Sequence, residues 1–273
     1  GPLPARPSPA KQRDARRSTL WPGPERASGP LLIIPMAASS AERLRRASVL
    51  IVGVGALGCA AAEALADAGI GRLGLVDPDN VERSNLHRQL LHRTTDLGRP
   101  KVESAAEKLA ARYGAVALAP VMARLDDRNA DVLFAGHDCV VDATDGVATK
   151  FLVNDAAVRR GRPLVHGGIA RFLGQLMTIL PGRSACYRCL FGAPPDASDV
   201  PSCQEAGVLG SLAGTIGLLQ AAEAIRYLTG TGTLLTDRLL TYDALTGRWR
   251  QVRLRRNPVC TACGAVADDR VGV

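Results

Sequence analysis

Short apolar runs alternate along this chain with stretches whose apolar residues recur at helical spacing. The runs predict five strands, at residues 49–52, 73–76, 117–121, 140–141 and 164–165. Helical patterns lie between and after them, at residues 59–68, 100–112, 128–134 and 150–160. Strands that alternate with helices predict an α/β fold of the Rossmann type, a mostly parallel sheet with helices on both faces.

The pattern changes after the glycine pair at residues 167–168. Antiparallel strands are predicted at residues 174–180, 238–243 and 248–254, with a turn between the last two. A long apolar helix is predicted at residues 207–228. Small residues recur closely along this helix, which predicts tight packing against the sheet or against a second subunit. We therefore expect the parallel sheet to be extended by C-terminal antiparallel strands.

Length and composition fit one large α/β domain. The chain has 273 residues, 47% of them apolar, which is enough for a sizeable core. No apolar run approaches the roughly 20 residues of a membrane-spanning helix, so we expect a soluble protein without a membrane partner. The net charge is +8, but residues 1–46 hold nine Lys or Arg against three Asp or Glu, which leaves +2 for the rest. This nearly neutral body does not predict nucleic-acid binding.

The first 35 residues differ from the remainder. They begin with Gly-Pro, are rich in Pro, Arg and Ser, and precede the first methionine, Met36. We predict that residues 1–35 are a disordered arm or a non-native extension, although a basic arm can also bind nucleic acid or an acidic surface. Residues 36–273 are predicted to form a single domain. The parts of a secretory signal do not occur in order, so we expect a cytoplasmic protein in a reducing compartment.

A glycine-rich turn follows the first predicted strand. Gly53, Gly55 and Gly58 open the next helix, a layout that lets backbone N–H groups approach a phosphate. Asp77 ends the second predicted strand, where a carboxylate can bind a ribose. These features alone fit a dinucleotide as well as a mononucleotide. The segments 84–89 and 98–101 then add two cations and two amides, which favour a triphosphate over a nicotinamide.

Two carboxylates follow the strand predicted at residues 140–141. Asp142 and Asp145 would lie at the carboxyl end of the sheet, near the glycine-rich turn. Mg²⁺ takes one or two carboxylates together with phosphate oxygens, so either residue is a reasonable ligand. Such a pair is otherwise a helix cap or a solvated turn.

The seven cysteines fall into three groups. Two C-x-x-C pairs, Cys186 with Cys189 and Cys260 with Cys263, predict a tetrahedral zinc site of four sulfurs, which is a structural role because no position is left for water. A redox-active pair is the alternative. Two further cysteines, Cys59 and Cys139, lie in apolar segments and are predicted core residues. The seventh, Cys203, precedes a predicted helix, where it is either a nucleophile or an incidental thiol.

The ordered motifs resemble those of the MoeB/ThiF/HesA group, the prokaryotic relatives of ubiquitin-activating enzymes. The resemblance covers about residues 42–264 and is carried by segments 53–58, 77–79, 84–89, 98–102, 142–145, 186–189, 203–208 and 257–260. It implies one adenylation domain of ThiF type over residues 36–273. It implies that ATP adenylates the C-terminal Gly-Gly carboxylate of a small ubiquitin-like sulfur-carrier protein, releasing pyrophosphate. A homodimer is also implied, because relatives share the ATP site across their interface.

The resemblance also implies roles for individual residues. Asp77 would bind the ribose, Asn85, Arg88 and Lys101 the phosphates, and Asp145 the magnesium ion. Arg88, Lys101 and Asp145 would then be catalytic, and Cys203 matches a cysteine that some members use for a thioester, acyl-disulfide or persulfide. The full set of residues expected to bind ATP is Gly53, Gly55, Ala56, Gly58, Asp77, Asp79, Asn85, Arg88, Gln89, Lys101 and Asp145.

The chain departs from the group in two places. Relatives usually open with Arg-Tyr-Ser-Arg-Gln, whose second arginine reaches the partner's ATP site, whereas residues 26–30 read Arg-Ala-Ser-Gly-Pro. A basic residue at 43, 45 or 46 is a possible substitute. Gly146 follows Asp145 where relatives commonly have Asn. Two alternatives stay open: a weak or inactive member that binds a carrier, or a peptide-adenylating enzyme of natural-product biosynthesis. An NAD-dependent oxidoreductase is disfavoured, because no His or Tyr suited to hydride transfer accompanies the glycine turn.

Overall fold

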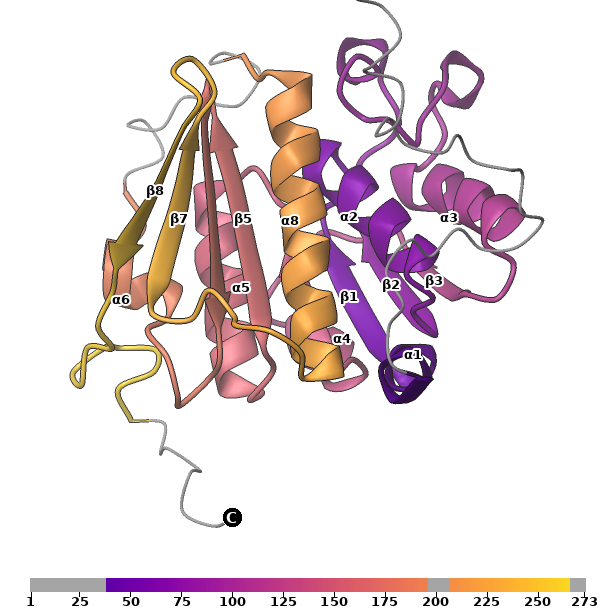
Figure 1. Ribbon diagram of the computed structural model, residues 1–273. Helices are drawn as coiled ribbons and strands as arrows, with labels where there is room; N and C mark the ends of the chain where they lie inside the picture. Colours follow the sequence, from indigo (N-terminus) through magenta and orange to yellow (C-terminus); the bar gives the residue numbers. More distant parts are fainter. Residues whose placement is uncertain (1–37, 196–206, 266–273) are drawn as a thin grey trace, which may run out of the picture. The chain divides into compact units, whose positions relative to one another are not determined.

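The structure is a computed structural model that describes residues 38–195 and 207–265. These residues form one mixed sheet in the order β3-β2-β1-β4-β5-β6-β7-β8 (Figure 1). The parallel part consists of β1 (Ser48–Val52), β2 (Arg72–Val76), β3 (Ala117–Val121), β4 (Cys139–Asp142) and β5 (Leu164–Ala170). The antiparallel part consists of β6 (Leu173–Ile179), β7 (Arg238–Asp243) and β8 (Arg248–Arg253). The predicted Rossmann-like sheet with antiparallel C-terminal strands is confirmed.

Helices cover both faces of the sheet, and the alternation of side chains along each strand explains how (Figure 1). In β1, Val49 and Ile51 join one buried cluster, whereas Leu50 and Val52 join the other. The first cluster includes residues of α1 (Ala38–Arg46), α2 (Ala56–Asp67), α3 (Lys101–Arg112) and α8 (Gly210–Thr229). The second includes residues of α4 (Ala130–Ala135), α5 (Val147–Arg159) and α6 (Tyr187–Phe191).

The small residues of α8 allow it to pack closely against its own chain. A Cβ atom on Gly217 would lie 2.3 Å from the carbonyl oxygen of Leu57 in α2. Ala213 is fully buried, whereas a Cβ atom on Gly214 would meet nothing within 4 Å. Most of the small-residue stripe is therefore used inside the molecule, and the face at Gly214 points away from it.

Several elements differ in extent from their predictions. The helix α2 begins at Ala56, directly after the glycine turn. The strands β4 and β5 are longer than the short apolar runs that predicted them, and β5 continues through the glycine pair to Ala170. None of the helices in the described ranges is both long and apolar enough to cross a membrane.

The topology of the sheet places a crevice at the carboxyl end of β1. The chain runs from β1 to β2 and β3 on one side, then crosses to β4 on the other side of β1. Val52, the last residue of β1, lies beside Asp142, the last residue of β4. Ligands of open α/β sheets bind at such switch points.

Candidate active site

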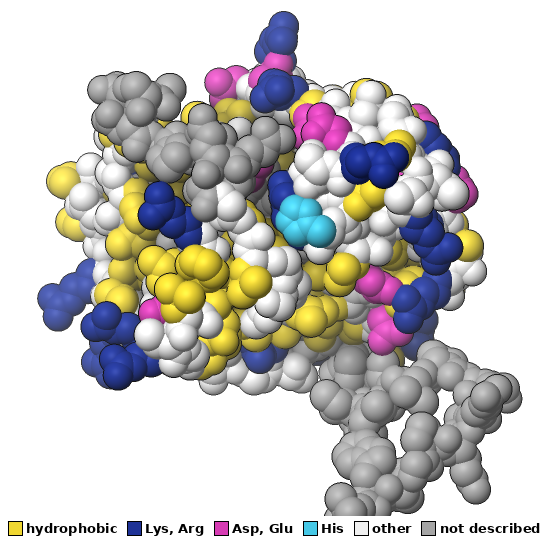
Figure 2. All heavy atoms as spheres, turned by 90° about the horizontal axis from the view of Figure 1, so that it is seen from above, with side chains coloured by type: hydrophobic (Ala, Val, Ile, Leu, Met, Phe, Trp, Pro, Cys, Tyr) yellow, Lys and Arg dark blue, Asp and Glu magenta, His cyan; other side chains and the backbone are white. Residues whose placement is uncertain are grey.

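A cavity of about 450 Å³ occupies this crevice. Its size lies within the range of roughly 300–1,000 Å³ that is typical of small-molecule sites. The expected ATP-binding residues that line it are Gly53, Gly55, Ala56, Asp77, Asp79, Asn85, Arg88, Gln89, Lys101 and Asp145. Motifs that lie as far as 92 residues apart in the sequence thus meet around one space. Figure 2 looks down on this side of the molecule.

The glycines of the turn have different roles. Gly53 has a φ of +92°, and a Cβ atom there would lie 2.7 Å from the carbonyl oxygen of Ala143. A Cβ atom on Gly58 would lie 1.9 Å from the carbonyl oxygen of Gly53, so Gly58 closes the turn and does not line the cavity. Gly55 precedes α2, whose first N–H groups have no partner within the helix and can bind an anion.

Asp77 holds the glycine turn in place. Its carboxylate accepts hydrogen bonds from the backbone N–H of Val54 at 2.7 Å and of Asp79 at 2.9 Å. Burial raises the pKa of Asp77, and the nearby Lys101 ammonium opposes that effect. From the other side, the buried His92 ring contacts the carbonyl oxygen of Val54 through Nε2 at 3.2 Å. Sequence reasoning assigned Asp77 only to ribose and missed its support of the turn.

The two expected phosphate-binding cations differ in their surroundings. The Nζ atom of Lys101 lies 2.8 Å from an oxygen of Asp79 and 4.0 Å from one of Asp77, and the residue is 5% exposed. An ammonium has three donors, so this ion pair leaves room for further acceptors. The guanidinium of Arg88 donates to the side-chain oxygen of Asn85 at 2.6 Å and has no ion-pair partner among the described residues.

The two carboxylates at the end of β4, Asp142 within the strand and Asp145 after it, have different environments. Asp142 is fully buried, and its oxygens accept hydrogen bonds from Thr144, from Lys150 at 3.2 Å and from His166 at 2.8 Å. Burial alone would raise the pKa of Asp142, but Lys150 and His166 outweigh burial and lower it. Asp145 is exposed and forms no ion pair with a described residue. Protein donors already occupy the oxygens of Asp142, whereas Asp145 lines the cavity, so this geometry favours Asp145 as the predicted magnesium ligand.

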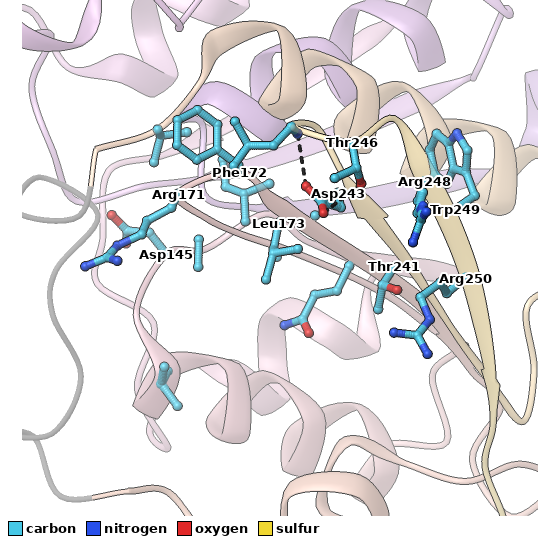
Figure 3. Close-up of a pocket in the computed structure, with 18 of the residues that line it drawn as sticks. Asp145, Arg171, Phe172, Leu173, Thr241, Asp243, Thr246, Arg248, Trp249 and Arg250 are labelled. Carbon is cyan, nitrogen blue, oxygen red and sulfur yellow. Dashed lines mark hydrogen bonds between the residues drawn. The ribbon is translucent and has the colours of Figure 1, made fainter.

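A second, larger opening lies beside the cavity and shares three lining residues with it. It has a volume of about 1,420 Å³ and is lined by the start of α5, by Tyr187 of α6 and by β5 to β8. We call it the trough; the close-up in Figure 3 draws its lining. Asp145, Ile169 and Val208 line both the trough and the cavity. Sequence reasoning missed the trough, because it depends on how the antiparallel strands are placed beside the parallel ones.

The four predicted zinc-binding sulfurs meet in one cluster. All lie within 4.8 Å of one another, and three separations are 3.8 Å (Cys186 to Cys189), 3.7 Å (Cys186 to Cys260) and 3.4 Å (Cys189 to Cys263). Tetrahedral zinc with Zn–S bonds of about 2.3 Å would place its sulfurs about 3.8 Å apart, so the cluster is consistent with zinc. Burial raises the pKa of Cys263 to about 11, so a cation beside this sulfur would favour its thiolate form. Burial also opposes ionisation of Cys260, but hydrogen bonds from the backbone at Cys263 and Ala262 lower the pKa of that thiol.

The remaining predicted residues divide between the described and the other parts of the chain. Cys59 and Cys139 are fully buried, and burial raises the pKa of each to about 12. Cys203 and the stretch at residues 26–30 lie outside the described residues. The basic residues considered as substitutes, Arg43, Arg45 and Arg46, do not line the cavity of their own chain.

Together, the fold and the cavity define an α/β nucleotide-binding protein with a four-cysteine cluster. Residues 31–262 match the sequence profile of the ThiF family, and the chain belongs to this family. The chain is 47% identical over 228 residues to "Sulfur carrier protein adenylyltransferase" of Thermus thermophilus, covering 82% of this chain and 84% of that protein. It is 45% identical over 229 residues to "SAMP-activating enzyme E1" of Haloferax volcanii, covering 84% of each.

Two further comparisons concern longer proteins. "Adenylyltransferase and sulfurtransferase MOCS3" of Bos taurus is 44% identical over 264 residues, which is 93% of this chain but 58% of that protein. Among solved structures, a crystal structure of E. coli MccB with AMPCPP and MccA has a TM-score of 0.74 at 22% identity, covering 83% of this chain and 69% of that one. The MccB likeness concerns the fold alone.

Proposed function

We propose that this ThiF-family adenylyltransferase uses ATP to adenylate the C-terminal carboxylate of a small ubiquitin-like sulfur-carrier protein that ends in Gly-Gly. One observation carries the proposal: Asp145, Ile169 and Val208 line both the trough and the nucleotide cavity, which makes these residues the junction of the two spaces. A carrier held over the trough can pass its tail to that junction. A tail that ends in Gly-Gly has no side chains to obstruct the passage. Relatives whose names include sulfur-carrier adenylation support this substrate class.

The reaction joins a carboxylate oxygen of the carrier to the α-phosphorus of ATP. The bond from that phosphorus to the oxygen bridging the α- and β-phosphates breaks, and pyrophosphate leaves with the electron pair. Such a displacement needs positioning and charge neutralisation rather than covalent help from the protein. The N-terminus of α2, Arg88 and Lys101 supply positive charge on the cavity wall, and Asp77 keeps the turn rigid while binding the ribose.

Asp145 is the residue we assign to magnesium. When bound there, Mg²⁺ would neutralise phosphate oxygens as the negative charge moves to the leaving group. The exposed carboxylate at the junction suits this role, because hard oxygen ligands are those that magnesium prefers. Residues 36–273 would then act as one adenylation domain, and Cys203 would serve the later transfer of sulfur.

The test is ATP–pyrophosphate exchange with purified carrier proteins that end in Gly-Gly. We expect exchange with the unaltered chain, and losses of at least about 10²-fold in Lys101→Ala and Asp145→Ala, the usual scale for removing one charge-stabilising group. Arg128→Ala is the control, because its side chain is 92% exposed and, among the described residues, pairs only with Asp126. Thermal unfolding of each variant separates lost chemistry from lost fold. Full exchange in both site variants would contradict the assignment, and no exchange with any carrier would contradict the function.

A further inference from the structure

The last strand of the sheet, β8, carries three arginines on an exposed edge. All six residues of β8 are exposed, and its only partner in the sheet is β7. Arg250 lies opposite Thr241 and Arg248 opposite Asp243, and all four residues line the trough. Arg253 lies three residues after Arg250, and side chains alternate between the faces of a strand, so its side chain projects from the other face. Two of the three arginines therefore face the trough.

These two guanidinium groups have no carboxylate partner in the described parts of the chain. Neither Arg248 nor Arg250 forms an ion pair there. Asp243 lies opposite Arg248, but its carboxylate already accepts hydrogen bonds from the N–H of Leu245 and the hydroxyl of Thr246. Arg171, which is exposed and forms no ion pair with a described residue, adds a third cation on the same lining. In Figure 3, Arg171 and Asp145 lie at one end of the lining, Arg248 and Arg250 at the other.

Large apolar side chains lie between and beside these cations. Phe172 is 42% exposed, Leu173 is 58% exposed and Leu245 is 71% exposed, and all three line the trough. Figure 2 shows hydrophobic and basic side chains next to each other on its left half, the side on which β7 and β8 lie in Figure 1. An exposed apolar patch with charges at its rim is typical of a protein-binding surface.

We propose that the trough recognises the folded body of the carrier through carboxylates that meet Arg248 and Arg250, next to an apolar patch that covers Phe172 and Leu173. This inference rests on the proposed function and adds the chemistry of the partner's surface. Arginine binds carboxylates in a bidentate manner, and opposite charges on two surfaces speed their encounter. The arginines of β8 thus select carriers by surface charge, whereas the tail alone reaches the nucleotide.

A nucleic acid is the less favoured occupant of the same surface. Asp145 and Asp243 also line the trough, and a phosphate backbone running along it would meet both carboxylates. A base would also have no free aromatic ring to stack on at Trp249. The Trp249 ring is stacked on Tyr242, with ring centroids 4.2 Å apart, and Tyr242 packs against the core cluster on the α8 side of the sheet. A folded protein, in contrast, can place its carboxylates opposite the arginines and away from Asp145 and Asp243.

The test uses a double variant that carries both Arg248→Glu and Arg250→Glu. Its control is the single variant Arg253→Glu, which puts an acid on the other face of the same strand. Pyrophosphate exchange is measured with a carrier that supports exchange by the unaltered chain, and with a synthetic peptide of that carrier's C-terminal tail. We expect the double variant to raise KM for the folded carrier at least about tenfold, with kcat within about twofold. KM for the tail peptide should be unchanged, and Arg253→Glu should match the unaltered chain.

Salt and RNA provide the remaining outcomes. KM of the unaltered chain for the folded carrier should rise with ionic strength, and that dependence should weaken in the double variant. An unchanged KM for the carrier in the double variant would overturn the inference, as would a loss of binding to a labelled oligoribonucleotide without any change in KM. Calorimetric titration with ATP establishes that the variant is folded. Absence of exchange by the unaltered chain with every carrier would instead count against the proposed function.

Discussion

At the scale of single residues, Gly53 joins two requirements of the nucleotide site. Its φ of +92° is one that other residues adopt only with strain, and a Cβ atom would press on the backbone of Ala143. We predict that Gly53→Ala lowers the free energy of unfolding by clearly more than the roughly 1–2 kcal/mol that a left-handed conformation costs. It should also weaken ATP binding at least about tenfold, because the Ala143 segment leads to Asp145.

Gly69 offers a matched comparison. Its φ is +84°, but a Cβ atom there would meet nothing within 4 Å. Gly69→Ala therefore carries the conformational strain without the contact, and it should leave ATP affinity unchanged. Chemical denaturation and calorimetric titration with ATP measure both effects. Equal losses of stability in the two variants would show that the close contact with Ala143 does not contribute to the free energy of unfolding.

The sequence predicted the residue types of the site better than their relations. The glycine turn joins β1 to α2, Asp77 directly follows β2, and Arg88 lies in the segment between β2 and α3, so all three are placed at the same edge of the sheet. The local sequence pattern could not distinguish Asp142 from Asp145, because both come shortly after the apolar run at residues 140–141 that predicted the strand. The difference lies in Lys150 and His166, which reach Asp142 from α5 and β5. Such contacts depend on tertiary packing and have no local pattern.

At the scale of elements, the four-cysteine cluster joins α6 to the segment that follows β8. Neighbouring contacts support it: Arg188 pairs with Asp155 of α5 at 2.8 Å, and the backbone N–H of Asn257 lies 3.3 Å from the sulfur of Cys189. We predict that the chain binds one zinc ion, and that Cys189→Ser loses it and unfolds at a lower temperature, because binding of the metal contributes to folding.

Metal content by mass spectrometry and thermal unfolding with and without a chelator measure these effects. Cys139→Ser is the control, because Cys139 lies buried in β4, outside the cluster. It should lose stability through its buried hydroxyl yet keep its zinc. A full zinc content in Cys189→Ser would contradict a site of four sulfurs.

Element boundaries show where sequence patterns mislead. The pattern ended the fifth strand at Val165, because Gly167 and Gly168 have low strand propensity. The structure continues β5 through them, since β6 pairs along its whole length and the side chain of Gln220 occupies the space beside Gly167. Gln220 also donates from its amide to the carbonyl oxygen of Asp142 at 2.6 Å. Here the glycines permit a close approach that the apolar pattern cannot reveal.

At the scale of the whole molecule, the outward face of α8 predicts how two copies associate. Gly214 and Leu218 lie one turn apart, a Cβ atom on Gly214 would meet nothing within 4 Å, and Leu218 is 54% exposed. An uncovered glycine next to an exposed leucine leaves room for a second helix, which suits a two-fold interface in which each surface meets its own copy. We therefore expect a homodimer, and we expect Leu218→Glu to weaken it at least about tenfold by placing a like charge on both sides. Val132→Glu is the control, because Val132 is 75% exposed on α4, against the other core cluster. Light scattering over a range of concentrations measures the mass, and a monomeric unaltered chain, or equal dimerisation by both variants, would exclude this face.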